Sequence, residues 1–438
     1  MKYSLVIRIN HILLVRREFR EEREEAEQKM SREITAEITA EIASEFAAEG
    51  TAKHTAEIIT ERATKDTTEL AAKDTSALTR DRIRGCLIGG AVGDALGYPV
   101  EFLYYSQIIH HFGEKGITEY DLDAQEGKAV ISDDTQMTLF TAEGLLNSAG
   151  KETEKIPYEV YRSYLNWYQT QMGRQSPESG KGKVGKANPG KINSGKGNSR
   201  LMEIPELYVC RAPGSTCLSA LSSGRMGDLE ESINMSKGCG GIMRVAPVAL
   251  YRKPDEAFTR KEIDLLGAQL AAITHGHPLG YIPAAVLAHI VNVGVYGGSR
   301  PGMGLADAVK EALETVQELF PESGFMPKLA ALLDRAVELA GNEKEDIENI
   351  SELGGGWVAE ETLAIAVYCS IRYCDDFSKG VIAAVNHSGD SDSTGAVIGN
   401  ILGAWLGLEG IGEKWLRDLE LRELILEMAD HLCLGCGC

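Results

Sequence analysis

Apolar residues recur every three or four positions along most of the chain, whereas long alternation of apolar and polar residues does not occur. The 3.6-residue period is clearest in segments 157–171, 305–320, 328–340, 359–373 and 413–433. This spacing gathers the apolar side chains on one face of a helix, as in helices that pack on a core. The pattern therefore predicts an all-α fold.

Two apolar segments also carry glycine at every fourth position. The glycines occupy positions 85, 89, 93 and 97 in one segment, and positions 395, 399, 403 and 407 in the other. A four-residue step places them on one stripe of a helix. Because glycine within a helix costs about 1 kcal/mol relative to alanine, the stripes indicate a compensating gain in packing. We expect each stripe to lie very close to another backbone.

The first 80 residues follow a different pattern. A four-residue unit, Glu-Ile-Thr-Ala at its clearest, begins at Glu33 and decays toward residue 76. On a helix of 3.6 residues per turn this period drifts by about 40° per unit, so it lacks the straight seam of a coiled coil. The segment fits either a dispensable extension, partly helical or disordered, or an oligomerisation or docking helix. We predict an extension over residues 1–80 and a globular domain over 81–438.

A second unusual stretch lies within that domain, at about residues 173–200. It is rich in glycine and carries seven Lys or Arg residues against one Glu. This composition predicts a flexible, basic surface insertion. A plain loop explains it, and so does a segment that reaches a phosphate-bearing substrate or partner.

The net charge and the cysteine content limit the partners and the compartment that we expect for this protein. The net charge of −20 disfavours nucleic acid and anionic membranes as partners. Nine cysteines, an odd number in a long chain, indicate a reducing compartment, and we expect a cytoplasmic protein. No apolar run reaches the roughly 20 residues of a membrane helix. The C-terminal Cys433, Cys436 and Cys438 could hold a soft metal but form an incomplete zinc site.

Acidic residues stand at the starts of two predicted helices. Asp390 and Asp392 lie just before the uncharged run 393–408, and Asp133 and Asp134 begin another apolar helix. The positive end of a helix dipole favours ionised carboxylates, and clustered carboxylates suit Mg²⁺, Mn²⁺ or Ca²⁺. The alternative is that these residues only cap their helices. With Glu101 after the first glycine stripe, three acidic helix ends predict one polynuclear site with oxygen ligands.

Two further motifs offer groups for binding a substrate. The glycine-rich turn of Gly238, Cys239, Gly240 and Gly241 could cradle phosphate oxygens with its backbone amides, although such turns are common. His275 and His277 stand at a helix boundary, where a histidine serves either as a ligand or as a cap.

Five motifs in this order resemble the ADP-ribosylglycohydrolase family, which includes the dinitrogenase-reductase-activating glycohydrolases. The resemblance covers about residues 81–432. The motifs are Gly93-Asp-Ala-Leu-Gly-Tyr-Pro-Val-Glu101, Ser132-Asp-Asp-Thr135, Gly238-Cys-Gly-Gly-Ile-Met-Arg244, Thr274-His275 with Leu279-Gly-Tyr281, and Gly389-Asp-Ser-Asp-Ser393.

The resemblance implies a compact orthogonal helical bundle around a central dinuclear site for two divalent cations, Mg²⁺ or Mn²⁺. It implies hydrolysis of the glycosidic bond between ADP-ribose and an acceptor, on an ADP-ribosylated protein or small molecule. The glycine-rich turn would hold the diphosphate, with His275 beside it. The implied catalytic residues are Glu101, Asp134 and Asp390. The implied metal ligands are Ser132, Asp133, Asp134, Asp390, Asp392 and Ser393.

The chain departs from the family pattern at three positions. Ser132 and Ser393 stand where threonine is common, which keeps the hydroxyl ligand. Cys239 stands where asparagine is frequent, which changes the contact expected with the diphosphate. Two other functions stay open: hydrolysis of another nucleotide or glycoside, and catalytically silent binding of ADP-ribose. Retention of five acidic groups argues against a silent protein.

Overall fold

Helices are the main regular structure in the described part of the chain, so the predicted all-α class is confirmed. The computed structural model describes residues 76–173, 199–256, 258–297 and 303–435. Within these residues, extended pairing is limited to two isolated bridges, Ala129 with Leu419 and Gly238 with Val358. The described residues from Thr79 onward, apart from Met303, belong to one structural unit.

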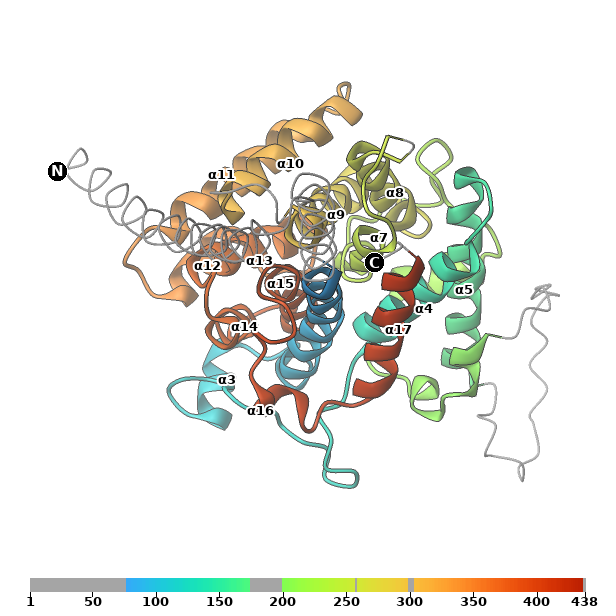
Figure 1. Ribbon diagram of the computed structural model, residues 1–438. Helices are drawn as coiled ribbons and strands as arrows, with labels where there is room; N and C mark the ends of the chain where they lie inside the picture. Colours follow the sequence, from blue (N-terminus) through green and yellow to red (C-terminus); the bar gives the residue numbers. More distant parts are fainter. Residues whose placement is uncertain (1–75, 174–198, 257, 298–302, 436–438) are drawn as a thin grey trace, which may run out of the picture. The chain divides into compact units, whose positions relative to one another are not determined.

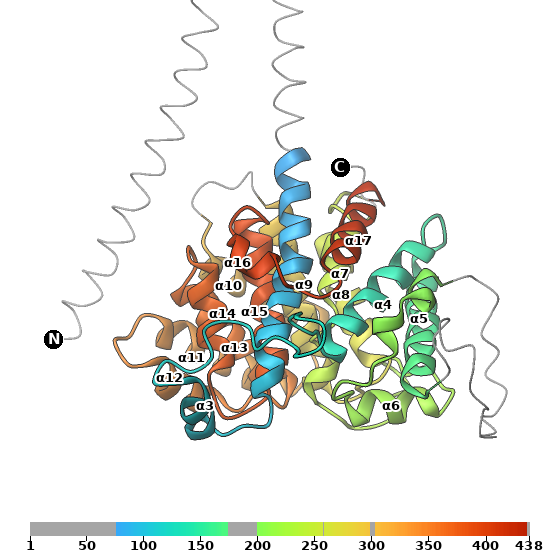
Figure 2. The same ribbon diagram turned by 90° about the horizontal axis from the view of Figure 1, so that it is seen from below.

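Two helices that carry the glycine stripes pack against each other in the middle of this unit (Figures 1 and 2). They are the helix of residues 76–97 and α15 (Ser391–Leu406). A Cβ atom added at Gly89 would lie 2.2 Å from the carbonyl oxygen of Gly399, and one added at Gly93 would lie 1.8 Å from that of Gly395. The glycines therefore meet in antiparallel order, at a distance that no side chain permits.

The other helices surround this pair. The longer ones are α4 (Asp133–Asn147), α5 (Ile156–Gln171), α8 (Arg260–Ala272), α9 (Pro278–Tyr296), α10 (Leu305–Leu319), α11 (Met326–Ala340), α13 (Ala359–Arg372) and α17 (Arg422–Gly435). The shorter ones are α3 (Tyr105–Phe112), α6 (Ser215–Ser222), α7 (Ala246–Tyr251), α12 (Asp346–Leu353), α14 (Phe377–Val385) and α16 (Glu413–Leu416).

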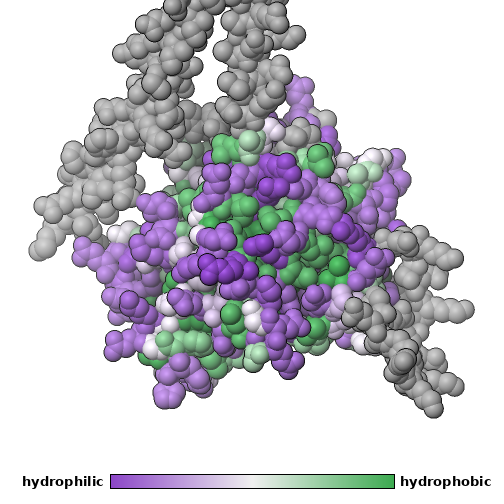
Figure 3. Space-filling model, turned by 60° about the horizontal axis from the view of Figure 1, so that its bottom comes forward, coloured by the Kyte–Doolittle hydropathy of each residue, from purple (hydrophilic) through white to green (hydrophobic). Residues whose placement is uncertain are grey.

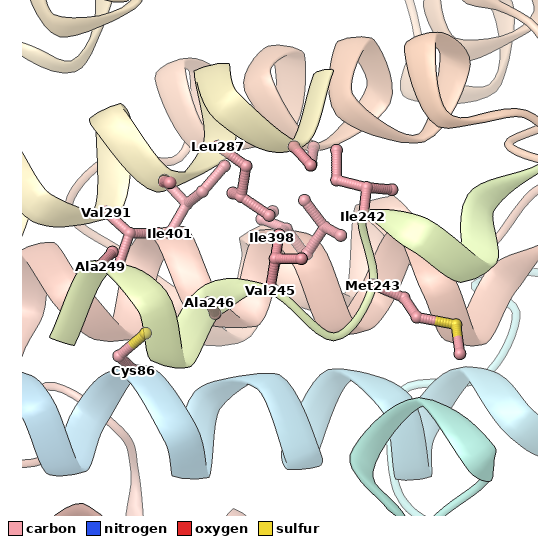
Figure 4. Close-up of a cluster of buried hydrophobic side chains, with 14 of the residues drawn as sticks. Cys86, Ile242, Met243, Val245, Ala246, Ala249, Leu287, Val291, Ile398 and Ile401 are labelled. Carbon is pink, nitrogen blue, oxygen red and sulfur yellow. The ribbon is translucent and has the colours of Figure 1, made fainter. Parts of the chain in front are cut away.

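The core joins several of these elements. Figure 4 shows Cys86 of the first described helix and Ala246 of α7 near Leu287 of α9 and Ile398 of α15, and all four side chains are fully buried. One buried polar contact crosses the same region, since the Asn400 side chain donates to the Cys86 carbonyl at 2.8 Å. Removal of these apolar side chains from water is the main stabilising contribution of the region.

Helix α9 is long and apolar enough to span a membrane by length and composition, but 89% of its apolar window is buried inside the protein. It is therefore a buried helix of the packed core. Hydrophilic residues cover much of the face shown in Figure 3, with hydrophobic residues visible between them.

The structure corrects one predicted helix. Segment 413–433 is not continuous, because α16 ends at Leu416 and α17 begins at Arg422. Between them the backbone pairs with Ala129, which donates to the Asp418 carbonyl and accepts from the Glu420 amide. Leu421 then adopts a φ of 54°, a conformation in which a helix cannot continue.

Several predicted segments lie wholly or largely outside the described residues. They are positions 1–75 of the N-terminal extension, positions 174–198 of the basic insertion, and Cys436 and Cys438. The domain boundary near residue 81 stays a prediction, and the first described helix begins at residue 76.

Candidate active site

Three carboxylates from distant parts of the chain meet beside the glycine-paired helices. One oxygen from each of Glu101, Asp390 and Asp392 lies within 4.8 Å of the others. Both aspartates are buried, whereas Glu101 is partly exposed. We call these residues, with Asp94, Asp133 and Asp134, the acidic cluster.

The start of α15 fixes the two aspartates of its own segment. Asp390 is the N-cap of the helix, and its Oδ1 accepts from the Ser393 amide at 3.2 Å. Its own amide donates to the Gly355 carbonyl at 2.8 Å. Gly389 is required there, because a Cβ atom would lie 1.9 Å from the same carbonyl oxygen. Asp390 thus caps α15 and also lies in the group of carboxylates, so both of the roles considered for its position are observed.

The start of α4 contributes the second pair of aspartates. Ser132 caps this helix by accepting from the Asp134 amide at 3.2 Å. Asp133 accepts from the Gly214 amide at 3.1 Å, whereas Asp134 Oδ2 is buried without a partner among the described residues. Burial, followed by repulsion from Asp392, raises the pKa values of Asp133 and Asp134 well above the usual range. The negative charge of Asp392, at the start of α15, therefore repels the carboxylates at the start of α4.

Asp94 is a member of the cluster that the motif analysis did not select. It is fully buried and accepts hydrogen bonds from the amides of Ser132 and Thr135, each at 3.1 Å, and from the Thr135 hydroxyl. Burial and the charge of Asp392 raise the pKa of Asp94 to about 7. Asp94 thus holds the start of α4 against the first glycine stripe. Its sequence signal was an aspartate inside an otherwise apolar helix.

The donor set fits hard divalent cations. Glu101 Oε2 and Asp134 Oδ2 are buried oxygens with no partner in the described structure. Burial and repulsion from Asp392, Asp390 and Asp133 raise the pKa of Glu101 to about 10. Arg211 is a nearby cation, and it already pairs with Glu420. Concentrated carboxylates that repel one another are the oxygen-rich environment that Mg²⁺, Mn²⁺ or Ca²⁺ prefers.

The glycine-rich turn borders the acidic cluster. Its centre is a short 3-10 helix, η5 (Cys239–Gly241), and the Cys239 thiol donates to Asp390 Oδ2 at 2.8 Å. This side chain therefore faces the carboxylates. Gly240 is explained by packing, since a Cβ atom there would lie 2.9 Å from Cys217 Sγ.

The two candidate histidines have different roles. His275 is buried beside the turn, with its Nε2 3.4 Å from the position that a Cβ atom on Gly238 would take. Burial and the nearby Arg244 lower the pKa of His275 to about 3, so its ring is neutral. His277 instead caps α9, because its side chain accepts from the Leu279 amide at 3.0 Å.

Comparison with known proteins identifies the family to which this chain belongs. The family model described as ADP-ribosylglycohydrolase matches residues 75–437. The chain belongs to the ADP-ribosylglycohydrolase family. It is an enzyme, and its class is that of the ADP-ribosylglycohydrolases, which hydrolyse glycosidic bonds.

Two relatives within this family carry names that state an activity. ADP-ribosylhydrolase ARH3 of Mus musculus is 24% identical over 79% of this chain and 89% of its own length. ADP-ribosylarginine hydrolase Tri1 of Serratia proteamaculans is 25% identical over 80% of this chain and 79% of its own length.

The solved structure of an ADP-ribosylglycohydrolase-related protein complex supports the fold of this ADP-ribosylglycohydrolase. The match covers 82% of this chain and 98% of the solved one, with a TM-score of 0.50 and 24% identity. At this identity the similarity concerns the helical fold alone.

Proposed function

We propose that this ADP-ribosylglycohydrolase releases ADP-ribose from an ADP-ribosylated protein side chain or small molecule and requires two divalent cations, Mg²⁺ or Mn²⁺. One observation carries the metal requirement: Glu101, Asp390 and Asp392 converge within 4.8 Å. Carboxylates this close repel one another and need a counter-charge to ionise together.

The ligands would come from the two helix starts. Ser132, Asp133 and Asp134 stand at the start of α4, and Asp390, Asp392 and Ser393 stand at the start of α15. Divalent cations bound there would neutralise the carboxylates, orient the ribose hydroxyls and make a water molecule more acidic. Asp94 would act behind them by holding Ser132 and Thr135 in place.

Glu101 is the best placed residue for moving a proton. It is the cluster member with partial exposure, and its Oε2 has no protein partner in the described structure. During hydrolysis the bond from the ribose anomeric carbon to the acceptor breaks, and a bond to the water oxygen forms. The water must lose a proton and the acceptor must gain one. We assign this general acid–base transfer to Glu101 Oε2, with Asp134 Oδ2 and Asp390 as the other catalytic carboxylates.

The glycine-rich turn would hold the diphosphate of ADP-ribose. Its position next to Asp390 supports this role, because a ribose held at the acidic cluster places its diphosphate nearby. The neutral His275 ring adds a hydrogen-bonding surface without a second charge. The amides of Gly240 and Gly241 would make this contact, since the Cys239 thiol donates to Asp390 and the Cys239 amide donates to the Trp357 carbonyl.

Release of free ADP-ribose tests the proposal. Peptides that carry ADP-ribose on arginine or on serine are incubated with the enzyme, and the product is measured by mass spectrometry with and without EDTA. We expect release that EDTA abolishes and that added Mg²⁺ or Mn²⁺ restores. Release that persists in EDTA would refute the metal requirement, and no release from either peptide would refute the substrate class.

A further inference from the structure

Two aromatic side chains form an exposed pair next to the acidic cluster. The rings of Phe102 and Trp357 stack with centroids 5.3 Å apart and an interplanar angle of 27°. Phe102 is 65% exposed and Trp357 is 43% exposed. We propose that this aromatic pair is the subsite for the acceptor and that it selects a planar cation, the guanidinium of ADP-ribosylated arginine. The inference rests on the proposed function and specifies its substrate.

The first ring is tied to Glu101 through the backbone. Phe102 follows Glu101 directly, and the Glu101 amide donates to the Gly97 carbonyl at 3.0 Å. Phe102 has a φ of 66°, which is rare for a bulky residue and strains the backbone. This conformation lets a carboxylate oxygen of Glu101 join the acidic cluster while the next side chain stays in solvent. Strained residues of this kind gather at ligand sites, where surrounding contacts maintain them.

The second ring, Trp357, is connected to the glycine-rich turn and to the start of α15. The Trp357 carbonyl accepts from the Cys239 amide at 3.3 Å, which joins it to the glycine-rich turn. Two residues earlier in the chain, the Gly355 carbonyl accepts from the Asp390 amide. Gly356, between them, has a φ of 77° that favours glycine. Trp357 thus stands on a loop that is anchored both to the turn and to the start of α15.

The aromatic pair is therefore joined by short stretches of backbone to Glu101 and to Asp390, two of the carboxylates that we assign to catalysis. A guanidinium is planar, permanently charged and weakly hydrated, so it stacks on tryptophan and phenylalanine faces. The acidic cluster adds a negative potential that attracts the same cation. A serine acceptor has neither a planar face nor a charge. The pair would thus favour an arginine-linked substrate over a serine-linked one.

The test compares kcat/KM for the two ADP-ribosylated peptides, arginine-linked over serine-linked, in parent and variants. We expect this ratio to exceed one in the parent and to fall by about tenfold in Trp357→Ala, mainly through KM for the arginine peptide. Trp357→Phe keeps an aromatic face and should stay within about threefold of the parent ratio. Tyr158→Ala is the matched control, because Tyr158 is an exposed aromatic residue on α5.

The outcomes separate the two proposals. An unchanged ratio in Trp357→Ala, or an equal loss in Trp357→Phe, overturns the acceptor subsite while ADP-ribose release by the parent upholds the proposed function. A parent that prefers the serine peptide also overturns the subsite. A parent that releases no ADP-ribose overturns both. If Trp357→Ala does not fold, Trp357→Leu carries the test, since it keeps bulk without an aromatic face.

Discussion

Asp390 shows how one side chain can both cap a helix and line an acidic site. The sequence placed it before an apolar run, and that position alone fitted either role. In the structure its Oδ1 accepts from the Ser393 amide, while its carboxylate group lies with those of Glu101 and Asp392. The two interpretations were not exclusive, because a carboxylate has two oxygens and several lone pairs. Its role as a metal ligand stays a prediction.

His387 offers a test of burial at the level of a single residue. Burial lowers the pKa of His387 to about 4, and its Nε2 lies 3.0 Å from Thr394 Oγ1. In the unfolded chain a histidine titrates near pH 6.5. The folded pKa is depressed, so the unfolded state binds the proton first. The stabilising contribution is present above about pH 6.5 and is lost as the pH falls toward 4.

The matched variant is His387→Asn. Between pH 6 and pH 5, we expect the free energy of unfolding of the parent, minus that of the variant, to fall by up to about 1.4 kcal/mol. Urea denaturation of both proteins at each pH measures this difference. Taking the difference cancels the titration of groups that both proteins share. A difference that stays constant across this range would mean that the folded protein accepts the proton as readily as the unfolded chain.

At the scale of elements, the glycine stripes were predictable but their pairing was not. The four-residue spacing required a close neighbour, and the structure supplies it by packing the two stripes on each other. Nothing in the local spacing identifies the partner, because antiparallel pairing depends on the whole chain. The break between α16 and α17 was likewise not predictable from the local sequence. It depends on backbone bonds to Ala129, almost 300 positions away, which outweigh the local helical pattern.

Gly399→Leu tests the contact between the stripes. A Cβ atom at Gly399 would lie 1.9 Å from the Gly89 carbonyl oxygen, and a backbone atom cannot move aside as a flexible side chain can. We expect a loss of at least about 3 kcal/mol of stability, at the upper end of overpacking effects, or failure to fold. Thermal denaturation measures the effect. Gly324→Leu is the control, because a Cβ atom there meets nothing within 4 Å. Equal melting temperatures for the two variants would contradict the proposed contact.

At the scale of the whole molecule, the order of five motifs predicted the family and the helical class. It did not reveal that Asp94 joins the acidic cluster or that Trp357 stacks on Phe102. Asp94 resembled one polar residue of a buried helix, and its importance rests on amides about 40 positions away. Trp357 approaches Phe102 only through folding, since the two residues are separated by more than 250 positions. The sequence therefore predicted which acidic groups come together better than it predicted the contacts that support them.

Removal of residues 1–78 tests the predicted domain organisation. The described structural unit begins at Thr79, and the acidic cluster draws on residues from Asp94 onward. We expect the truncated protein to keep its helical circular dichroism spectrum and its ADP-ribose release to within about twofold. Loss of soluble expression or of Mn²⁺ binding would show that the extension belongs to the fold.

The central claim is that helix starts more than 250 positions apart form one metal site. Isothermal titration with Mn²⁺ tests it most directly, on the parent, Asp134→Asn, Asp390→Asn and the double variant. We predict weaker Mn²⁺ binding in each single variant, with turnover at least about 10²-fold lower. The double variant should be scarcely worse than either single one, because residues that act as a unit are not additive. Unchanged Mn²⁺ affinity and stoichiometry in all three variants would contradict the account and leave these aspartates as helix caps.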